Sequence, residues 1–158
     1  MKNKAVGVVV VLGVAMVVAS AAVLAQSDPH VGTWVLSLEK SKYAPGTAPK
    51  SQTSVFAATG QEMKVTTKAV TASGTNNTEY TASFDGKDHP VKGNPDWDTT
   101  SLKRIDSHTI EFTRKKAGKV VQTARSTVAK DGKTRTVTVT GVNAQGQKVN
   151  TSALYIKQ

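Results

Sequence analysis

The sequence contains no cysteine, and this absence limits both the stability and the chemistry of the protein. No disulfide can stabilise the fold, no thiol can act as a nucleophile, and no cysteine is available to carry a lipid. The Gly-x-Ser-x-Gly pattern of serine hydrolases is also missing. Stability must therefore come from an ordinary hydrophobic core, and the sequence predicts a protein that is not an enzyme and has no catalytic residues.

Aromatic residues are scarce, at 5% of the sequence, and apolar residues never repeat at helical spacing for more than a turn. Few aromatic side chains leave little bulk to fill an interior and equally little to grip a ligand. The missing helical period favours an all-β fold, because the remaining periodic pattern is the alternation of apolar and polar residues that half-buried strands show.

The N-terminus has the pattern of a secretory signal peptide. Two early lysines precede a run of apolar and small residues from Ala5 to Ala22, and compact residues lead up to Ala25. We expect cleavage after Ala25, so that residues 1–25 are a signal peptide and residues 26–158 form one exported domain, periplasmic or extracellular, without a transmembrane segment. An uncleaved anchor is the alternative, because the apolar run approaches the length of a bilayer span.

Glycine-bearing turn signals recur along the rest of the chain. They are Thr59-Gly60, Ser73-Gly74, Asp85-Gly86, Ala117-Gly118, Asp131-Gly132 and Gln145-Gly146. Glycine supplies the positive φ angle that tight hairpins need, and repeated hairpins pair sequential strands antiparallel. The sequence therefore predicts an all-β fold: an antiparallel up-and-down meander of about 8–10 strands that closes into a barrel and so protects its edges.

Alternating residues place the expected strands between these turns. The ranges are 30–38, 51–57, 63–69, 79–84, 89–92, 99–105, 109–113, 119–129, 134–140 and 147–156. In the first of them Trp34, Leu36 and Leu38 share one parity and should face the core. The Pro- and Gly-containing stretch Ser41–Lys50 is expected to be a loop. A two-sheet sandwich is the alternative architecture, but consecutive hairpins favour the barrel.

The order of these features resembles the lipocalin and wider calycin barrels, in particular small exported bacterial lipocalin-like proteins of unassigned function. Gly32-Thr33-Trp34 matches the Gly-x-Trp motif that opens the first strand of that family, and Ser41–Lys50 lies where lipocalins carry a large loop over their cup. The resemblance implies a lipocalin-like barrel with Trp34 in a structural role at the closed end. It also implies an arginine from a late strand over that tryptophan, and Arg125 and Arg135 are both candidates.

A barrel of this size can be filled by its own side chains or can hold one small ligand. We expect non-catalytic binding of a small, largely apolar molecule in the cup, gated by the Ser41–Lys50 loop. The predicted ligand-binding residues are Tyr43, Met63, Tyr80, Phe84, Trp97, Leu102, Phe112 and Tyr155. The alternative is that these side chains fill the barrel and leave no cavity.

The formal net charge of +10 supports a different kind of partner. An envelope protein of this charge could bind an anionic glycan or lipid surface through a basic face. The local basic cluster is Arg114-Lys115-Lys116 with Lys119 nearby, and it falls at a hairpin turn. Nucleic acid is not expected as a partner of an exported protein.

Two further patterns could carry chemistry. The sequence has three histidines, and a small barrel enzyme could use His89 or His108 beside an acid. An irregular segment also concentrates oxygen ligands of the kind that calcium prefers, at Asp85, Asp88, Asn94, Asp96 and Asp98. We favour turn chemistry for this segment, because Asp and Asn cap backbone amides in turns. No metal and no cofactor is predicted.

Overall fold

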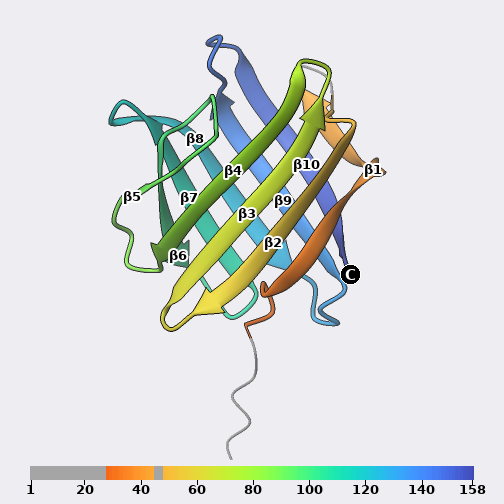
Figure 1. Ribbon diagram of the computed structural model, residues 1–158. Coiled ribbons are helices and arrows are strands. Elements are labelled where there is room, and N and C mark those ends of the chain that lie inside the picture. The colour runs from red at the N-terminus through yellow and green to blue at the C-terminus, as the bar shows by residue number, and fades with distance from the viewer. Residues whose placement is uncertain (1–27, 45–47) are drawn as a thin grey trace, which may run out of the picture.

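The computed structural model describes residues 28–44 and 48–158 (Figure 1). The expected signal peptide and its cleavage point lie outside this range. The described residues form ten β-strands and no helix. Accordingly, the described part of the chain includes no helix of the length and apolarity that crossing a membrane requires.

The strands follow one another with short connections. Their bounds are β1 (Gly32–Ala44), β2 (Ser51–Thr59), β3 (Glu62–Thr71), β4 (Gly74–Ser83), β5 (His89–Pro90), β6 (Thr99–Arg104), β7 (Thr109–Lys116), β8 (Lys119–Val128), β9 (Thr134–Val142) and β10 (Lys148–Lys157). All belong to one sheet in the order β4-β3-β2-β1-β10-β9-β8-β7-β6-β5, and β1 pairs antiparallel with β10. The predicted all-β antiparallel meander is confirmed.

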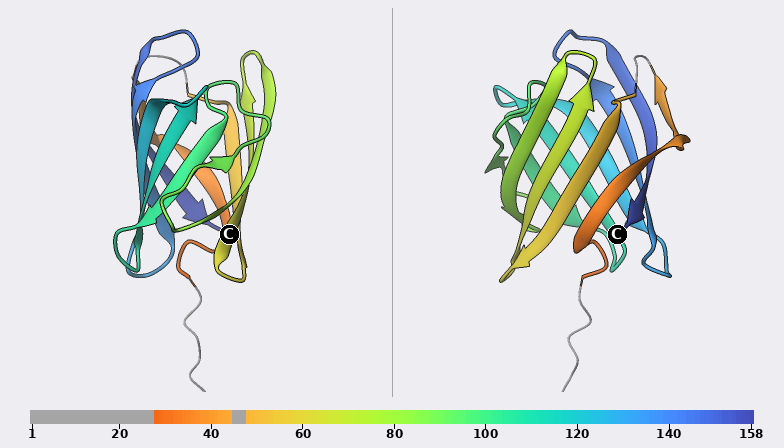
Figure 2. Two further views of the ribbon diagram at one scale, coloured as in Figure 1. Left: turned by 90° about the vertical axis from the view of Figure 1, so that its left-hand side faces the viewer. Right: turned by 45° about the vertical axis from the view of Figure 1, so that its right-hand side comes forward.

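The two edges of this order, β4 and β5, approach each other and nearly close the sheet into a barrel (Figure 2). Glu79 in β4 and Lys92 just after β5 exchange backbone hydrogen bonds of 3.0 and 2.9 Å. Nearby, the Gly86 amide donates to the Leu102 carbonyl over 3.1 Å. These bonds satisfy part of each edge, and a sheet with paired edges does not offer a template for other chains.

Alternation along the strands builds the interior. In β8, Gln122, Ala124, Ser126 and Val128 are buried while the residues between them are exposed or half-buried. The fully buried large side chains include Trp34 near the start of β1, Met63 near the start of β3 and Val128 at the end of β8, which lie at the same end of the barrel. Each contributes about 1.5–3 kcal/mol through removal of apolar surface from water. This end is the closed end.

Trp34 is held there by polar as well as apolar contacts. Its Nε1 donates to the His30 carbonyl over 2.8 Å, and the Arg135 guanidinium lies 5.2 Å from the centre of its ring. The arginine that the family resemblance implies is therefore Arg135. Arg125 lies on the outside of the barrel, 3.3 Å from Glu111.

The first strand differs from its prediction. Trp34 and Leu36 are buried, but Leu38 is 45% exposed, so the expectation that it faces the core is wrong. The pairing of β1 with β10 shifts register between Ser37 and Lys42, and this bulge breaks the alternation. Ser41 bridges the bulge, since its Oγ donates to the Ser37 carbonyl over 2.6 Å and accepts from the Leu154 amide over 2.9 Å.

The strand then continues to Ala44, so the first part of the loop predicted at Ser41–Lys50 is in fact β-strand. The bulge lets the strand bend and resume its pairing with β10. The prediction of a short strand at 89–92 is correct in place but too long, because β5 contains only His89 and Pro90.

Candidate functional site

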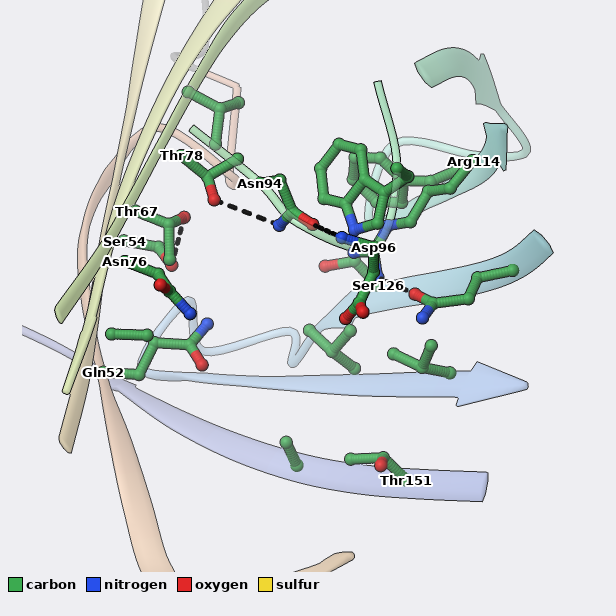
Figure 3. Close-up of a pocket in the computed structure, with 18 of the residues that line it drawn as sticks. Gln52, Ser54, Thr67, Asn76, Thr78, Asn94, Asp96, Arg114, Ser126 and Thr151 are labelled. Atoms are coloured by element: carbon green, nitrogen blue, oxygen red, sulfur yellow. Dashed lines mark hydrogen bonds between the residues drawn. The ribbon is translucent and has the colours of Figure 1, made fainter. Parts of the chain in front are cut away.

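The barrel contains a cavity of about 290 Å³, and Figure 3 shows many of the residues that line it. Its lining residues come from β1 to β4, from the segment before β6, and from β7 to β10. They are Tyr43, Gln52, Ser54, Phe56, Val65, Thr67, Ala69, Asn76, Thr78, Tyr80, Asn94, Pro95, Asp96, Trp97, Phe112, Arg114, Gln122, Ser126, Arg135, Val137, Val139, Val149, Thr151, Ala153 and Tyr155. The inward side chains therefore do not fill the barrel.

The wall formed by β2, β3 and β4 changes from apolar to polar toward the mouth. Strand register aligns three inward rows across these strands, which are Phe56-Val65-Tyr80, Ser54-Thr67-Thr78 and Gln52-Ala69-Asn76. The Ser54 and Thr67 hydroxyls lie 2.9 Å apart, and Asn94 Nδ2 donates to Thr78 Oγ1 over 3.1 Å. Figure 3 shows this hydroxyl and amide face on the side of the cavity away from Arg114.

The wall formed by β9 and β10 is mainly apolar. The inward parity of these strands presents Val137, Val139, Val149 and Ala153 to the cavity. Thr151 is the polar member of this row. A molecule in the cavity thus meets hydrocarbon on one side and hydrogen-bonding groups on the other.

Arg135 supplies a buried cation at the floor of the cavity. The residue is 3% exposed, and its guanidinium lies 4.4 Å from the centre of the Phe56 ring and 4.7 Å from that of Tyr155. No acid pairs with it among the described residues, and its shielded Nε has no hydrogen-bond partner there. Burial lowers the pKa of Arg135 to about 10, so the side chain is still protonated at neutral pH.

Arg114 supplies a second cation, from β7. Its Nη1 donates to Gln122 Oε1 over 3.0 Å, and its guanidinium lies 4.7 Å from the centre of the Trp97 ring. The Nε is shielded from solvent and has no partner among the described residues. Burial lowers the pKa of Arg114, while the charge of Asp96 acts in the opposite direction.

Two tyrosine hydroxyls lie in the lining together with the two arginines. Burial raises the pKa of Tyr80 to about 12 and also raises the pKa of Tyr155, although both arginines act in the opposite direction on both hydroxyls. At neutral pH both hydroxyls are therefore neutral and can donate hydrogen bonds. The Tyr80 ring stands edge-on to Trp97, with ring centres 6.0 Å apart.

The segment from Gly93 to Asp98 covers part of the mouth and is fixed at three places. The Ala144 amide donates to Asp96 Oδ1 over 2.8 Å, and the Ala117 amide donates to Asp98 Oδ2 over 2.9 Å. Gly93 approaches the backbone of β4 closely, with φ of +72°. In the described part of the predicted Ser41–Lys50 loop, Tyr43 lines the cavity, and gating by that stretch stays a prediction.

The same contacts explain the acidic residues that resembled a calcium loop. Asp85 accepts from the Lys87 amide over 3.0 Å, and Asn94 accepts from the Asp96 amide over 3.0 Å. Asp88 pairs with Lys115 over 2.7 Å. The contacts of Asp85 and Asn94 are turn contacts of the kind that the sequence favours, whereas Asp88 forms an ion pair and Asp96 and Asp98 accept from amides far along the chain. In the part of the chain that the structure describes, no three metal-ligating acids or histidines gather in one place.

The predicted ligand-binding residues separate into two groups. Tyr43, Tyr80, Trp97, Phe112 and Tyr155 line the cavity, whereas Met63, Phe84 and Leu102 do not. Met63 and Leu102 are buried in the core, and the half-buried Phe84 ring lies 4.0 Å below the guanidinium of Arg104. A role in ligand binding stays a prediction for each of them.

The most polar lining residues were missed by the sequence analysis. Arg114 was read as part of a surface cluster, yet it shares the inward parity of Ile110 and Phe112 in β7. Arg135 likewise shares the parity of Val137 and was named only as a partner for the tryptophan. The alternation itself is the signal for both: it reaches Arg114 one residue beyond the expected strand 109–113, and Arg135 lies inside the expected strand 134–140.

Because the Arg114 side chain points into the barrel, it is not part of the basic surface cluster that the sequence predicts. Lys115 is engaged with Asp88, which leaves Lys116 and Lys119 exposed at the turn between β7 and β8. Two lysines at a hairpin are a common solvated feature.

The histidines of the enzyme alternative lie outside the cavity lining. His89 Nε2 is 3.3 Å from Asp85 Oδ1 beside β5, and half-buried His108 is in the turn between β6 and β7. His30 is buried at the closed end, where its Nδ1 lies 3.3 Å from Asp28 Oδ1. None of these side chains meets the space in which a small molecule would sit.

Comparison with known proteins gives limited information. No protein-family model matches the chain, and no curated protein matches it. Among solved structures, the chain is similar to the siderocalin Ex-FABP, which is described as functioning through dual ligand specificities. The match has 14% sequence identity and a TM-score of 0.43, and it covers 82% of this chain and 74% of that one. The ligands are a property of Ex-FABP, and nothing about the function of this chain follows from the match.

Proposed function

We propose that the protein is a non-catalytic binding protein that holds one small molecule inside its barrel. The observation that carries this proposal is the cavity of about 290 Å³, lined by inward residues of both polar and apolar kinds. Protein interiors are normally close-packed, and their buried polar groups normally have partners. A bound molecule would fill this space and give its buried polar groups their hydrogen-bond partners.

The apolar part of that molecule would pack against Val137, Val139 and Phe112. Each Å² of apolar surface removed from water there contributes about 25 cal/mol. The Ser54-Thr67-Thr78 row would contact its polar part. The volume is close to the lower end of ordinary ligand pockets, roughly 300 Å³, so the molecule is small.

We also propose that the protein acts after export, in the periplasm or outside the cell. Support comes from the lysines, apolar run and compact residues of positions 1–25.

Blocking the cavity tests the proposed binding. Val139 lines the cavity, whereas Val120 in β8 is 57% exposed on the surface. A fraction of a small-molecule extract that binds the protein should raise the melting temperature of the wild-type protein. We expect the same fraction to leave the melting temperature of Val139→Trp unchanged. Val120→Trp, the same substitution outside the barrel, should leave that rise unchanged. Equal responses of the two variants, with both folded by circular dichroism, would show that binding does not use the cavity.

A further inference from the structure

The charges that line the cavity do not balance. Its ionisable lining residues, tyrosines aside, are Arg114, Arg135 and Asp96, which leaves one uncompensated positive charge. The Asp96 carboxylate is moreover engaged by the Ala144 amide. A buried cation without a partner is costly, and proteins normally pair it or expose it.

Building on the proposed function, we infer that the ligand is a small carboxylic acid whose carboxylate is bound in the cavity by Arg114, with Arg135 contributing charge from the floor. The cation of Arg114 is available for this because its acceptor within the barrel is the neutral Gln122. A carboxylate accepts parallel hydrogen bonds from a guanidinium, and such charge-assisted bonds are the stronger kind.

The charge of the lining and its hydroxyl donors favour a singly charged anion over other ligands. A neutral molecule would leave the excess positive charge unpaired, and a cation would be repelled by it. A phosphate, with about two negative charges at neutral pH, would exceed the single positive charge that the lining residues leave. Tyr80 and Tyr155 both line the cavity, and their neutral hydroxyls can donate hydrogen bonds to a carboxylate.

The rest of the cavity restricts the body of the acid. Val137 and Val139 favour a hydrocarbon or aromatic part, and Trp97 offers a ring face beside Arg114. The amides of Gln52 and Asn76 lie across the cavity from Arg114 and favour a hydroxyl or carbonyl group on the part of the acid that faces them (Figure 3). The ligand class is therefore a small amphipathic acid.

The test compares acids with their neutral amides of the same shape. The probes are octanoate with octanamide, and 4-hydroxycinnamate with 4-hydroxycinnamamide, each titrated into the full chain by isothermal calorimetry. We expect the wild-type protein to bind at least one acid roughly tenfold or more tightly than its amide, because charged hydrogen bonds contribute more than neutral ones. Binding should persist at high salt, since a buried ion pair is little screened.

Variants separate charge from shape. Arg114→Gln should lower the affinity for the acid by roughly tenfold to a hundredfold and leave the affinity for the amide almost unchanged. Arg114→Lys should recover part of the loss. Lys119→Gln removes the same charge from the exposed turn and should change neither affinity. Arg135 is not substituted in this test, because its contact with Trp34 also serves the fold.

The possible outcomes are distinct. If acid and amide bind equally and Val139→Trp abolishes both, the cavity is a binding site but the inferred carboxylate recognition is wrong. If Arg114→Gln lowers the affinities for acid and amide equally, Arg114 shapes the cavity and does not recognise the charge of the ligand. This outcome also overturns the inference. If neither member of either pair binds, the inference fails together with the proposed function.

Discussion

At the scale of single residues, the closed end depends on an acid that ties the segment before β1 to the barrel. Asp28 forms an ion pair with Arg104 of β6 and accepts from the His30 amide over 2.9 Å. Burial opposes the charge of Asp28, but the hydrogen bonds from His30 and the charge of Arg104 outweigh it and lower the pKa to about 2. The ionised carboxylate is thus part of the folded structure at neutral pH.

This pKa predicts a loss of stability in acid. The folded pKa is below the ordinary value of 3.8, so the stabilisation is complete above about pH 4 and disappears as the pH falls toward 2. We expect about 1 kcal/mol from this pair, because solvent partly screens it. In urea unfolding, Asp28→Asn should have a lower free energy of unfolding than the wild-type protein at pH 7. Between pH 4 and 2 its free energy of unfolding should also fall less steeply than that of the wild-type protein. An unchanged pH dependence would contradict this role.

Single residues also show where reasoning from sequence stopped. Alternation placed Met63, Val65 and Tyr80 inside correctly. Arg114 was assigned to the surface because two lysines follow it, although its parity is inward. A charged side chain at an inward position is explained only by what surrounds it, and those surroundings come from strands far away in the sequence.

At the scale of elements, the segment Gly93–Asp98 positions Trp97 and Asp96 at the mouth. Gly93 makes this possible, because a Cβ at this position would overlap the carbonyl oxygen of Asn77 in β4. The residue also adopts a positive φ of +72°, which side chains other than glycine rarely tolerate.

We expect Gly93→Ala to displace this segment and lower the free energy of unfolding by about 2 kcal/mol or more. Gly86→Ala is the matched control, because Gly86 has a φ of +73° and nothing within 4 Å of an added Cβ. The control variant should lose about 1 kcal/mol from the backbone conformation alone. Chemical unfolding measures both, and equal losses would show that the close approach to Asn77 does not matter.

The strands themselves were predictable because turn glycines and alternation act locally. From β2 to β10 the expected ranges agree with the structure within three residues, except that β4 begins at Gly74 and not at residue 79. The end of β1 was missed because the bulge at Ser37–Lys42 depends on its pairing with β10, at the other end of the chain. The covering segment was missed for the same reason, since its anchors at Ala117 and Ala144 follow it in sequence.

At the scale of the whole molecule, the barrel separates two functions along its axis. The end near Trp34 is packed with fully buried side chains and provides stability. The rest of the barrel is less filled, and hydroxyls, amides and Arg114 surround a cavity whose floor is Arg135, beside Trp34. Whether the barrel is filled or hollow does not follow from the sequence, because it depends on how the inward side chains of all the strands meet in space.

Native mass spectrometry of the protein purified from its own export compartment tests the central claim most directly. The account predicts a chain that begins at Gln26 and carries a reproducible mass excess, lost on denaturation and recovered as an acid in negative-ion mode. A bare mass that stays bare after incubation with a lipid and metabolite extract would contradict the proposed binding function.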